Sequence, residues 1–257
     1  MRLRFYVDLP FRPLTRVLVC IVQRMITSDR PDPSEIEAVV FDAGGVLLLP
    51  DIAAGRDALA SFSCKFGTEE WERAFYRGSA FVDQVEEVHW PLVRREIAAA
   101  LGVDDGRLDE AVPIVERLIL EMPWTAVPGA AEVLNALSAS GFLLAVVSNA
   151  GGTVESELAA VGVCSVDDDA VPRVGIVVDS HHVGVEKPDP RIFEFALESL
   201  GIEASRAIYI GDTVRFDVLG AEAAGIHPVH MDPFNLCRGE HAHIRRLGDL
   251  TEWCAGP

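Results

Sequence analysis

Short runs of apolar and often β-branched residues recur along this chain, and each ends at a small or polar residue. The clearest are residues 38–41, 142–147, 174–178, 207–210 and 227–231. Stretches with apolar residues at helical spacing, such as 130–140 and 191–200, lie between them. A strand that is apolar throughout is buried on both faces, which is typical of a parallel sheet covered by helices. The pattern therefore predicts an α/β fold with a doubly wound parallel sheet.

Residues 51–125 interrupt this alternation. They contain four stretches with helical spacing, one of them after the capping sequence that begins at Thr68 and another after Pro91, and show no strand pattern. The insert leaves the sheet directly after the first strand, so it should lie above the strand ends. We therefore predict an all-helical cap domain at 51–125 and a core formed by residues 36–50 and 126–257.

The first 35 residues differ in composition from the rest. Residues 1–30 carry six arginines and two aspartates, a net charge of +4 within a chain whose total is −18. We predict a basic, poorly ordered extension at 1–35, or a start assigned upstream of a true first residue at Met25. A short membrane-surface helix around residues 17–22 is the alternative.

Charge and cysteine content exclude several classes of protein. The pI near 4.7 argues against a nucleic-acid partner, because phosphate backbones attract basic surfaces. The five cysteines are scattered without a C-x-x-C pair, which excludes a zinc ribbon or a disulfide scaffold and fits a reducing compartment. No apolar run approaches the roughly 20 residues of a membrane span. We expect a cytoplasmic protein with no stable membrane association.

Polar side chains follow the predicted strands at their carboxyl ends. They are Asp42, Ser148, Asn149, Lys187, Asp212 and Asp217. The carboxyl ends of parallel strands meet at one edge of a sheet, where open α/β sheets bind their ligands. Carboxylates suit Mg²⁺, which prefers hard oxygen ligands, while a lysine and a hydroxyl can bind an anionic group. The set therefore predicts one site for phosphoryl transfer, in which Asp42 is placed to act as a nucleophile.

These residues resemble the motifs of the haloacid dehalogenase-like (HAD) hydrolase superfamily. The matching segments are residues 41–47, 146–149, 185–190, and 209–213 with 217–221. The resemblance covers residues 36–231 and implies a Rossmann-like core. The helical insert is similar to the C1-type cap of one branch of the superfamily, subfamily IA.

The resemblance implies a Mg²⁺-dependent hydrolase that acts on a small phosphorylated metabolite through an aspartyl-phosphate. The residues that match catalytic and substrate-binding positions of the family are Asp42, Ser148, Asn149 and Lys187. Those that match its metal-binding positions are Asp42, the backbone carbonyl of Gly44, Asp212 and Asp217. The resemblance leaves the substrate and the oligomeric state open.

One position departs from the pattern of the family's phosphatases. These enzymes usually carry a second Asp two residues after the nucleophile, which protonates the leaving group and later activates water. In this chain that position is Gly44, which has no side chain to carry a proton. General acid–base catalysis contributes roughly 10²–10⁴ in rate, so the absence bears directly on mechanism.

The predicted cap carries charged side chains that could reach a substrate. Asp51 and His89 are candidate replacements for the missing acid, although a loop carboxylate and a surface histidine are the commoner interpretation. Arg94 and Arg95 could bind a substrate anion, but most such pairs are solvated.

Three functions stay open on this basis. The first is a phosphatase that obtains its acid elsewhere or needs none. The second is a dehalogenase, since a halide leaves without protonation. The third is a weakly active or non-catalytic module that binds a phosphorylated ligand. We favour the phosphatase, because Asp42, Ser148, Lys187 and Asp212 are all retained.

Two pairs of histidines are weaker signals. His181 and His182 are adjacent, so on an extended segment they would point to opposite faces. His241 and His243 could share a face, but no Cys or carboxylate stands beside them at the usual ligand spacing. We predict no metal site from either pair, and we expect residues 233–257 to form a surface return over the sheet edge.

Overall fold

The computed structural model describes residue 31 and residues 33–254. Most of the predicted extension at 1–35 therefore lies outside the described residues, apart from a short turn, η1 (Pro33–Glu35). Within the described part of the chain, no helix combines the length and the apolar composition that crossing a membrane requires.

Six parallel strands form the central sheet, in the order β5-β4-β1-β6-β7-β8. They are β1 (Ala38–Phe41), β4 (Leu143–Ser148), β5 (Ile176–Asp179), β6 (Ala207–Gly211), β7 (His227–Met231) and β8 (Ala242–Ile244). The strand β1 lies between β4 and β6, where Phe41 pairs with Val146 and Ile210. This register places Asp42 beside the ends of the strands that carry Ser148 and Asp212. The predicted doubly wound parallel sheet is confirmed.

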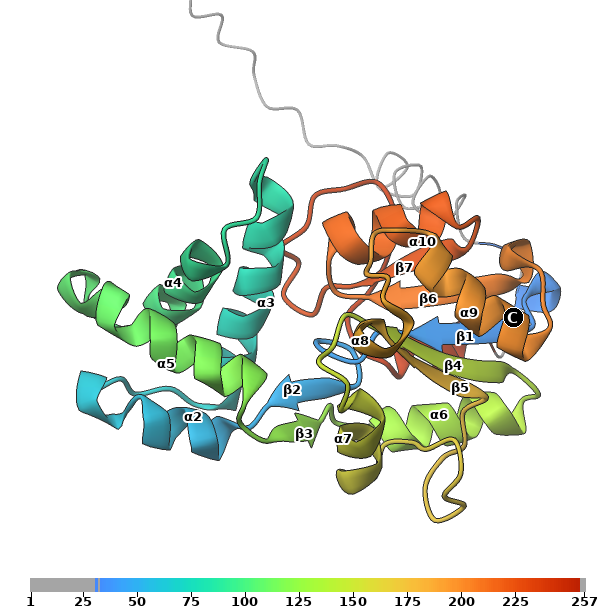
Figure 1. Ribbon diagram of the computed structural model, residues 1–257, viewed down its shortest axis with the longest axis horizontal. Helices are drawn as coiled ribbons and strands as arrows, with labels where there is room; N and C mark the ends of the chain where they lie inside the picture. Colours follow the sequence, from blue (N-terminus) through green and yellow to red (C-terminus); the bar gives the residue numbers. More distant parts are fainter. Residues whose placement is uncertain (1–30, 32, 255–257) are drawn as a thin grey trace, which may run out of the picture.

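Helices cover both faces of this sheet (Figure 1). On one face, α6 (Ala130–Ala139), α7 (Val154–Ala160) and α11 (Asp249–Cys254) pack against Val39 and Phe41 of β1. On the other, α9 (Arg191–Leu200) and α10 (Leu219–Ala223) pack against Ala38 and Val40. Successive residues of β1 thus serve opposite cores, which explains why the whole strand is apolar. The short helix α8 (Ser180–Val183) follows β5, and the turns η4 (Ala204–Arg206) and η5 (Val214–Val218) flank β6.

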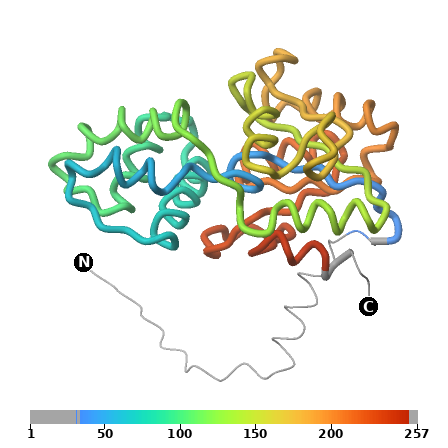
Figure 2. The backbone as a smooth tube through the Cα atoms, turned by 90° about the horizontal axis from the view of Figure 1, so that it is seen from below, coloured from blue at the N-terminus to red at the C-terminus, as the bar shows by residue number. Residues whose placement is uncertain are grey.

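Four helices that follow one another between β2 (Leu48–Pro50) and β3 (Trp124–Ala126) form a separate lobe (Figure 2), and this lobe has its own apolar core. They are α2 (Ile52–Ala58), α3 (Thr68–Gln84), α4 (Trp90–Ala100) and α5 (Leu108–Leu120), with the turns η2 (Ala60–Phe62) and η3 (Asp105–Arg107). The arrowheads of β1 and β6 point toward this lobe (Figure 1). The lobe therefore lies at the end of the sheet where the polar side chains gather.

Two short strands join the lobe to the sheet. The strand β2 (Leu48–Pro50) pairs antiparallel with β3 (Trp124–Ala126). The prediction that residues 51–125 contain no strand is therefore wrong at Trp124 and Thr125. A strand of three residues is too short to show an alternating pattern, and its partner lies more than seventy positions away in the sequence.

The chain after residue 233 contributes to the sheet as well as to the surface. The strand β8 adds a sixth strand beside β7, and α11 packs under the sheet. The expectation of a plain surface return is wrong here. The strand was hidden because its three residues, Ala242 to Ile244, include a histidine and give little apolar signal.

Candidate active site

The residues predicted from the sequence line one cavity of about 560 Å³ between the helical lobe and the strand ends. They are Asp42, Gly44, Ser148, Asn149, Lys187, Asp212 and Asp217. Lobe residues on α3, α4 and α5 complete its walls. The cavity is thus bounded on one side by the sheet and on the other by the inserted lobe.

Lys187 is the centre of the polar network in this cavity. The residue is 3% exposed, and its ammonium lies 2.9 Å from Asp42 Oδ1, 2.7 Å from Asp217 Oδ1 and 2.9 Å from the hydroxyl of Tyr209. Burial disfavours the charged form, but the carboxylates of Asp217 and Asp42 outweigh it and raise the pKa of Lys187. The lysine therefore stays positively charged against the nucleophile candidate.

Three buried carboxylates share this small space. Donor oxygens of Asp42, Asp212 and Asp217 all lie within 4.8 Å of one another. Burial, followed by repulsion from Asp217, raises the pKa of Asp42 to about 6 against the pull of Lys187. Burial and repulsion from the other two carboxylates raise the pKa of Asp212 well above its usual range. The charge of one lysine does not balance the charges of three carboxylates, so excess negative charge faces the cavity. Carboxylates are hard oxygen donors, and this set of donors fits Mg²⁺.

Asp217 differs from the other two carboxylates because both of its oxygens are engaged. Oδ1 accepts from Lys187 and Tyr209, and Oδ2 accepts from the backbone N–H and the hydroxyl of Thr213 at 2.9 and 2.6 Å. Burial opposes ionisation, but Lys187 and the Thr213 hydrogen bonds prevail and lower the pKa of Asp217. A Cβ at Gly211 would lie 2.2 Å from the Cβ of Asp217, so only glycine admits this arrangement. Asp217 is therefore a fixed anion that orients Lys187.

Asn149 holds the backbone that presents Lys187. Its Nδ2 donates to the Lys187 carbonyl at 3.0 Å, and its Oδ1 accepts from the Lys187 N–H at 2.7 Å. Two hydrogen bonds to one residue fix both the position and the rotation of that backbone segment. Beside Asn149, Ser148 ends β4 with its side chain buried in the cavity wall.

Helix α3 of the lobe contacts the site directly, which sequence reasoning missed. The hydroxyl of Ser79 donates to Asp212 Oδ2 at 2.7 Å, and that of Tyr76 donates to the Gly45 carbonyl at 2.7 Å. The carboxylate of Asp83 accepts the N–H groups of Val214 and Arg215 at 2.9 and 2.8 Å. Helical spacing alone does not single out these polar residues, because their partners are more than thirty positions away.

The structure does not bring Asp51 or His89 to the cavity. Asp51 caps α2 by accepting the N–H of Ala54 at 2.7 Å, and His89 is an exposed residue that precedes α4. The acidic side chains that do line the cavity, besides the three aspartates, are Glu116 and Glu186. At Gly44, where the family's phosphatases usually carry the acid, there is space for a side chain to begin. A Cβ at Gly44 would lie 3.7 Å from the ring of Trp124, which is an ordinary contact.

Arg94 lies in the cavity wall rather than in solvent. It is 8% exposed, its guanidinium stacks 5.0 Å from the ring of Trp90, and its Nε has no hydrogen-bond partner among the described residues. Burial lowers its pKa, and the carboxylate of Glu116 across the cavity wall opposes this. Arg95 is exposed and ion-paired with Asp109. Of the two arginines, therefore, only Arg95 is solvated, as expected from the sequence for both.

Comparison with known proteins gives a consistent family. The profile of the haloacid dehalogenase-like hydrolases matches residues 36–225. A glyceraldehyde 3-phosphate phosphatase from Methanothermobacter thermautotrophicus is 33% identical over 127 residues, which cover 48% of this chain and 52% of that protein. A phosphoglycolate phosphatase from Pseudomonas savastanoi pv. phaseolicola is 30% identical over 197 residues, 73% of this chain and 66% of that protein. The chain spans about half the length of several curated relatives that it matches.

A solved structure supports the fold. The putative HAD hydrolase YfnB from Bacillus subtilis, bound to magnesium, superposes with a TM-score of 0.57 at 18% identity, covering 84% of this chain and 97% of that one. At this identity the likeness concerns the fold alone. The family profile, by contrast, spans the strand ends that carry the polar network and most of the described residues. The chain belongs to the haloacid dehalogenase-like hydrolase family.

Proposed function

We propose that this protein is a Mg²⁺-dependent phosphatase that hydrolyses small phosphorylated metabolites through a phosphorylated Asp42. The observation that carries the proposal is the convergence of Asp42, Asp212 and Asp217 within 4.8 Å, with Lys187 between two of them. The names of the two phosphatase relatives support the same reaction class.

Each side chain then has a defined task. Asp42 is the nucleophile: one of its oxygens bonds to phosphorus while the bond from phosphorus to the leaving oxygen breaks, and water later releases phosphate from Asp42. Lys187 and Ser148 bind the oxygens of the transferring group, whose charge they stabilise from fixed positions. Asn149 and Asp217 position Lys187. When bound, Mg²⁺ supplies positive charge that draws an anionic phosphate toward an anionic nucleophile.

Asp42, the Gly44 carbonyl and Asp212 are the ligands that we propose for this ion. Ser79 donates to Oδ2 of Asp212, and no residue of the described lobe donates to Oδ1, which leaves that oxygen for the ion. Asp217 was also predicted as a ligand from the sequence, and that role stays a prediction. Because both oxygens of Asp217 already accept hydrogen bonds, we propose instead that Asp217 positions Lys187.

The first test is phosphate release from a panel of phosphorylated metabolites with and without Mg²⁺ between pH 5 and pH 8. We expect release only with Mg²⁺. The rate should fall below about pH 6, because the pKa of Asp42 is raised to about 6 and its protonated form neither attacks nor binds the ion. Since Mg²⁺ and protons compete for Asp42, more Mg²⁺ should move this fall to lower pH.

Two results would contradict this assignment. Phosphate release that persists in EDTA would show that the reaction does not need a metal ion. Chloride release from a 2-chlorocarboxylate without Mg²⁺, in place of phosphate release, would identify a dehalogenase.

The environment of Arg94 indicates which class of substrate the cavity binds. The Nε of this buried guanidinium has no hydrogen-bond partner among the described residues, and Glu116 acts on it only at longer range, so an anionic group of a ligand would satisfy it. We therefore propose substrates with a second anionic group, a carboxylate or a second phosphate, beside the phosphate that is removed. The cavity of about 560 Å³ is large enough for such a small metabolite.

The variant Arg94→Met tests this specificity. We expect KM for doubly anionic substrates to rise about 10- to 100-fold, which corresponds to the roughly 1.5–3 kcal/mol of a hydrogen bond to a charged group. The kcat value and the hydrolysis of p-nitrophenyl phosphate should change little. The matched control is Arg95→Met, since Arg95 is exposed and pairs with Asp109. Equal effects on singly and doubly anionic substrates would show that Arg94 serves only the fold of the lobe.

A further inference from the structure

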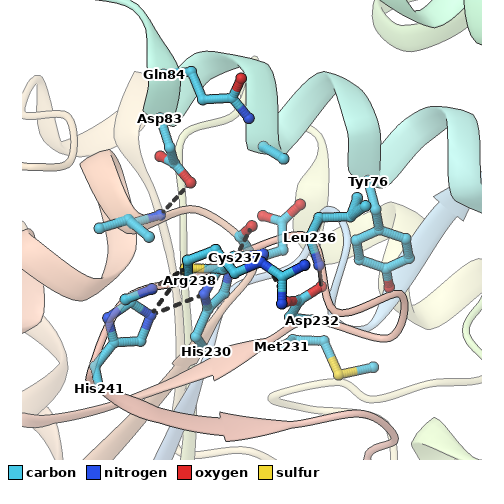
Figure 3. Close-up of a pocket in the computed structure, with 14 residues that line it drawn as sticks. Tyr76, Asp83, Gln84, His230, Met231, Asp232, Leu236, Cys237, Arg238 and His241 are labelled. Atoms are coloured by element: carbon cyan, nitrogen blue, oxygen red, sulfur yellow. Dashed lines mark hydrogen bonds between the residues drawn. The ribbon is translucent and has the colours of Figure 1, made fainter. Parts of the chain in front are cut away.

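A second group of metal-binding side chains lies where β7, β8 and the loop between them meet. His230 belongs to β7, His243 to β8, and Cys237 and His241 to the loop. One donor atom from each lies within 4.8 Å of every other. Figure 3 shows the rings of His230 and His241 beside the sulfur of Cys237. None of these residues belongs to the phosphoryl-transfer network.

The strand register explains why the sequence did not reveal this group. His230 pairs with His243 across β7 and β8, so the two side chains lie on the same face of the sheet. The loop then returns Cys237 and His241 over that face. The sequence-based view that His241 and His243 have no cysteine partner is therefore wrong, because folding supplies Cys237.

The donor distances are close to those of a tetrahedral site. His230 Nδ1 lies 3.0 Å from His241 Nε2, and Cys237 Sγ lies 3.7 Å from the same nitrogen. Around a zinc ion, with bonds of about 2.0–2.1 Å to nitrogen and about 2.3 Å to sulfur, neighbouring donors stand about 3.3–3.6 Å apart. Both measured distances lie within a few tenths of an ångström of these values.

Hydrogen bonds around the group orient its members as in known metal sites. The Asp212 carbonyl can only accept, so His230 donates from Nε2 at 3.1 Å and keeps its Nδ1 lone pair facing the other donors. Asp232 accepts the backbone N–H of Cys237 at 2.9 Å, and the N–H of Gly239 donates to the Cys237 sulfur at 3.2 Å. Burial raises the pKa of the Cys237 thiol and the Gly239 hydrogen bond opposes this, so a bound ion would have to displace the thiol proton to form the thiolate.

The loop backbone approaches the ring of His241 closely at Gly239. A Cβ at Gly239 would lie 2.5 Å from His241 Cε1. Burial lowers the pKa of His230, and burial with repulsion from the other rings lowers that of His241 to about 4. These lowered pKa values favour the neutral imidazoles of His230 and His241, the form that binds a metal ion. A cavity of about 450 Å³, also lined by Asp212, gives an ion access to the group.

We propose that His230, Cys237, His241 and His243 bind one Zn²⁺ in a closed tetrahedral site that fastens loop 232–241 to the sheet. One thiolate and three imidazoles favour zinc over Mg²⁺, whereas the carboxylates around Asp42 have the opposite preference. Four protein ligands leave no open position, so the ion is structural. Through the hydrogen bond from His230 to the Asp212 carbonyl, the site also holds the strand end that carries Asp212.

The test uses the full chain, freed of metal by a chelator and titrated with Co²⁺ and then Zn²⁺ in excess Mg²⁺. Co²⁺ reports tetrahedral coordination by visible absorption and thiolate coordination by a charge-transfer band in the near ultraviolet. We expect one Co²⁺ per chain, both signals, and displacement by one Zn²⁺. Cys237→Ser should remove the charge-transfer band and weaken Zn²⁺ binding about 100-fold or more, and His241→Gln should also weaken binding.

Two control variants separate this site from the rest of the chain. Cys64→Ser changes another partly buried cysteine, in the helical lobe, and should leave both signals intact. Asp42→Asn removes a carboxylate of the other site and should also leave them intact. The proposal is overturned if wild type binds no stoichiometric Zn²⁺, if Cys237→Ser keeps the charge-transfer band, or if Asp42→Asn removes it. The readout of this experiment is metal binding and not phosphatase activity, so each proposal can fail independently of the other.

Discussion

Replacing Asp42 with Asn should abolish phosphate release while leaving the protein folded. The substitution keeps the shape of the side chain but removes the nucleophilic oxygen, and the expected fall in kcat is about 10⁴-fold or more. The measurement is phosphate release from the best substrate of the panel, with single-turnover assays to exclude a slow product step.

The same variant should be more stable than the wild type when no metal is present. The pKa of Asp42 in the fold, about 6, exceeds the ordinary value of an aspartate, 3.8, so the folded protein resists ionisation of this group. Stability therefore falls as pH rises between those two values, and above pH 6 the cost is on the order of 3 kcal/mol. The neutral amide removes that cost, while Lys187 keeps Asp217 at 2.7 Å. At pH 7.5 we expect the melting temperature in EDTA to rise by several degrees.

A matched substitution elsewhere controls this experiment. Asp51→Asn makes the same chemical change at the N-cap of α2, outside the cavity, where Asn is an equally good capping residue. Its activity and melting temperature should both stay near those of the wild type. Full activity in Asp42→Asn would refute the nucleophile assignment. Loss of activity together with a lower melting temperature would show that the variant reports damage to the fold.

The sheet and most of the network around Asp42 follow from the sequence for one physical reason. In a parallel sheet the carboxyl ends of all strands lie at one edge, so Asp42, Ser148 and Asp212 come together without any knowledge of side-chain contacts. The same argument placed Lys187, whose segment follows β5. The type and the direction of the strands were enough to predict that these side chains lie close together.

Features that depend on pairing between distant segments did not follow from the sequence. The ribbon of β2 and β3 joins residues far apart in the chain, and each strand is too short to show a period. Ser79 looked like one polar residue among others on an amphipathic helix, yet it reaches Asp212. Cys237 and His230 became neighbours of His241 only because β8 adds to the sheet beside β7. Register and burial decide these contacts, and neither is visible in local composition.

Arg94 shows the same limit at the level of one side chain. Two adjacent arginines on a helix were expected to be solvated, and Arg95 is. Helix α4 turns Arg94 toward the cavity, on the side of the buried residues Val93, Ile97 and Ala98. A charged residue on the apolar side of a helix departs from the rule that this side carries apolar residues. Such departures are expected where a ligand binds.

The second large effect is expected from restoring a carboxyl group at Gly44. Gly44 does not have a positive φ, and a Cβ there would lie 3.7 Å from the Trp124 ring, so a side chain can begin at this position without backbone strain or a close contact of its Cβ. For phosphate esters of ordinary alcohols, whose leaving oxygen must be protonated, we expect kcat to rise about 10²-fold or more. For p-nitrophenyl phosphate, whose leaving group needs no proton, kcat should change little.

This contrast between leaving groups separates proton transfer from every other effect of the substitution. Gly44→Asn is the matched control: it has the same size and polarity but no proton to transfer, and should show no gain with either ester. A gain in both variants would indicate better packing against Trp124. No gain in Gly44→Asp with alkyl esters would mean that another side chain already protonates the leaving group. Glu116 and Glu186 line the cavity and would be the residues to substitute next. A selective gain would instead mean that no other side chain supplies the proton, and that the substrate of the proposed phosphatase has a leaving group stable enough to depart unprotonated.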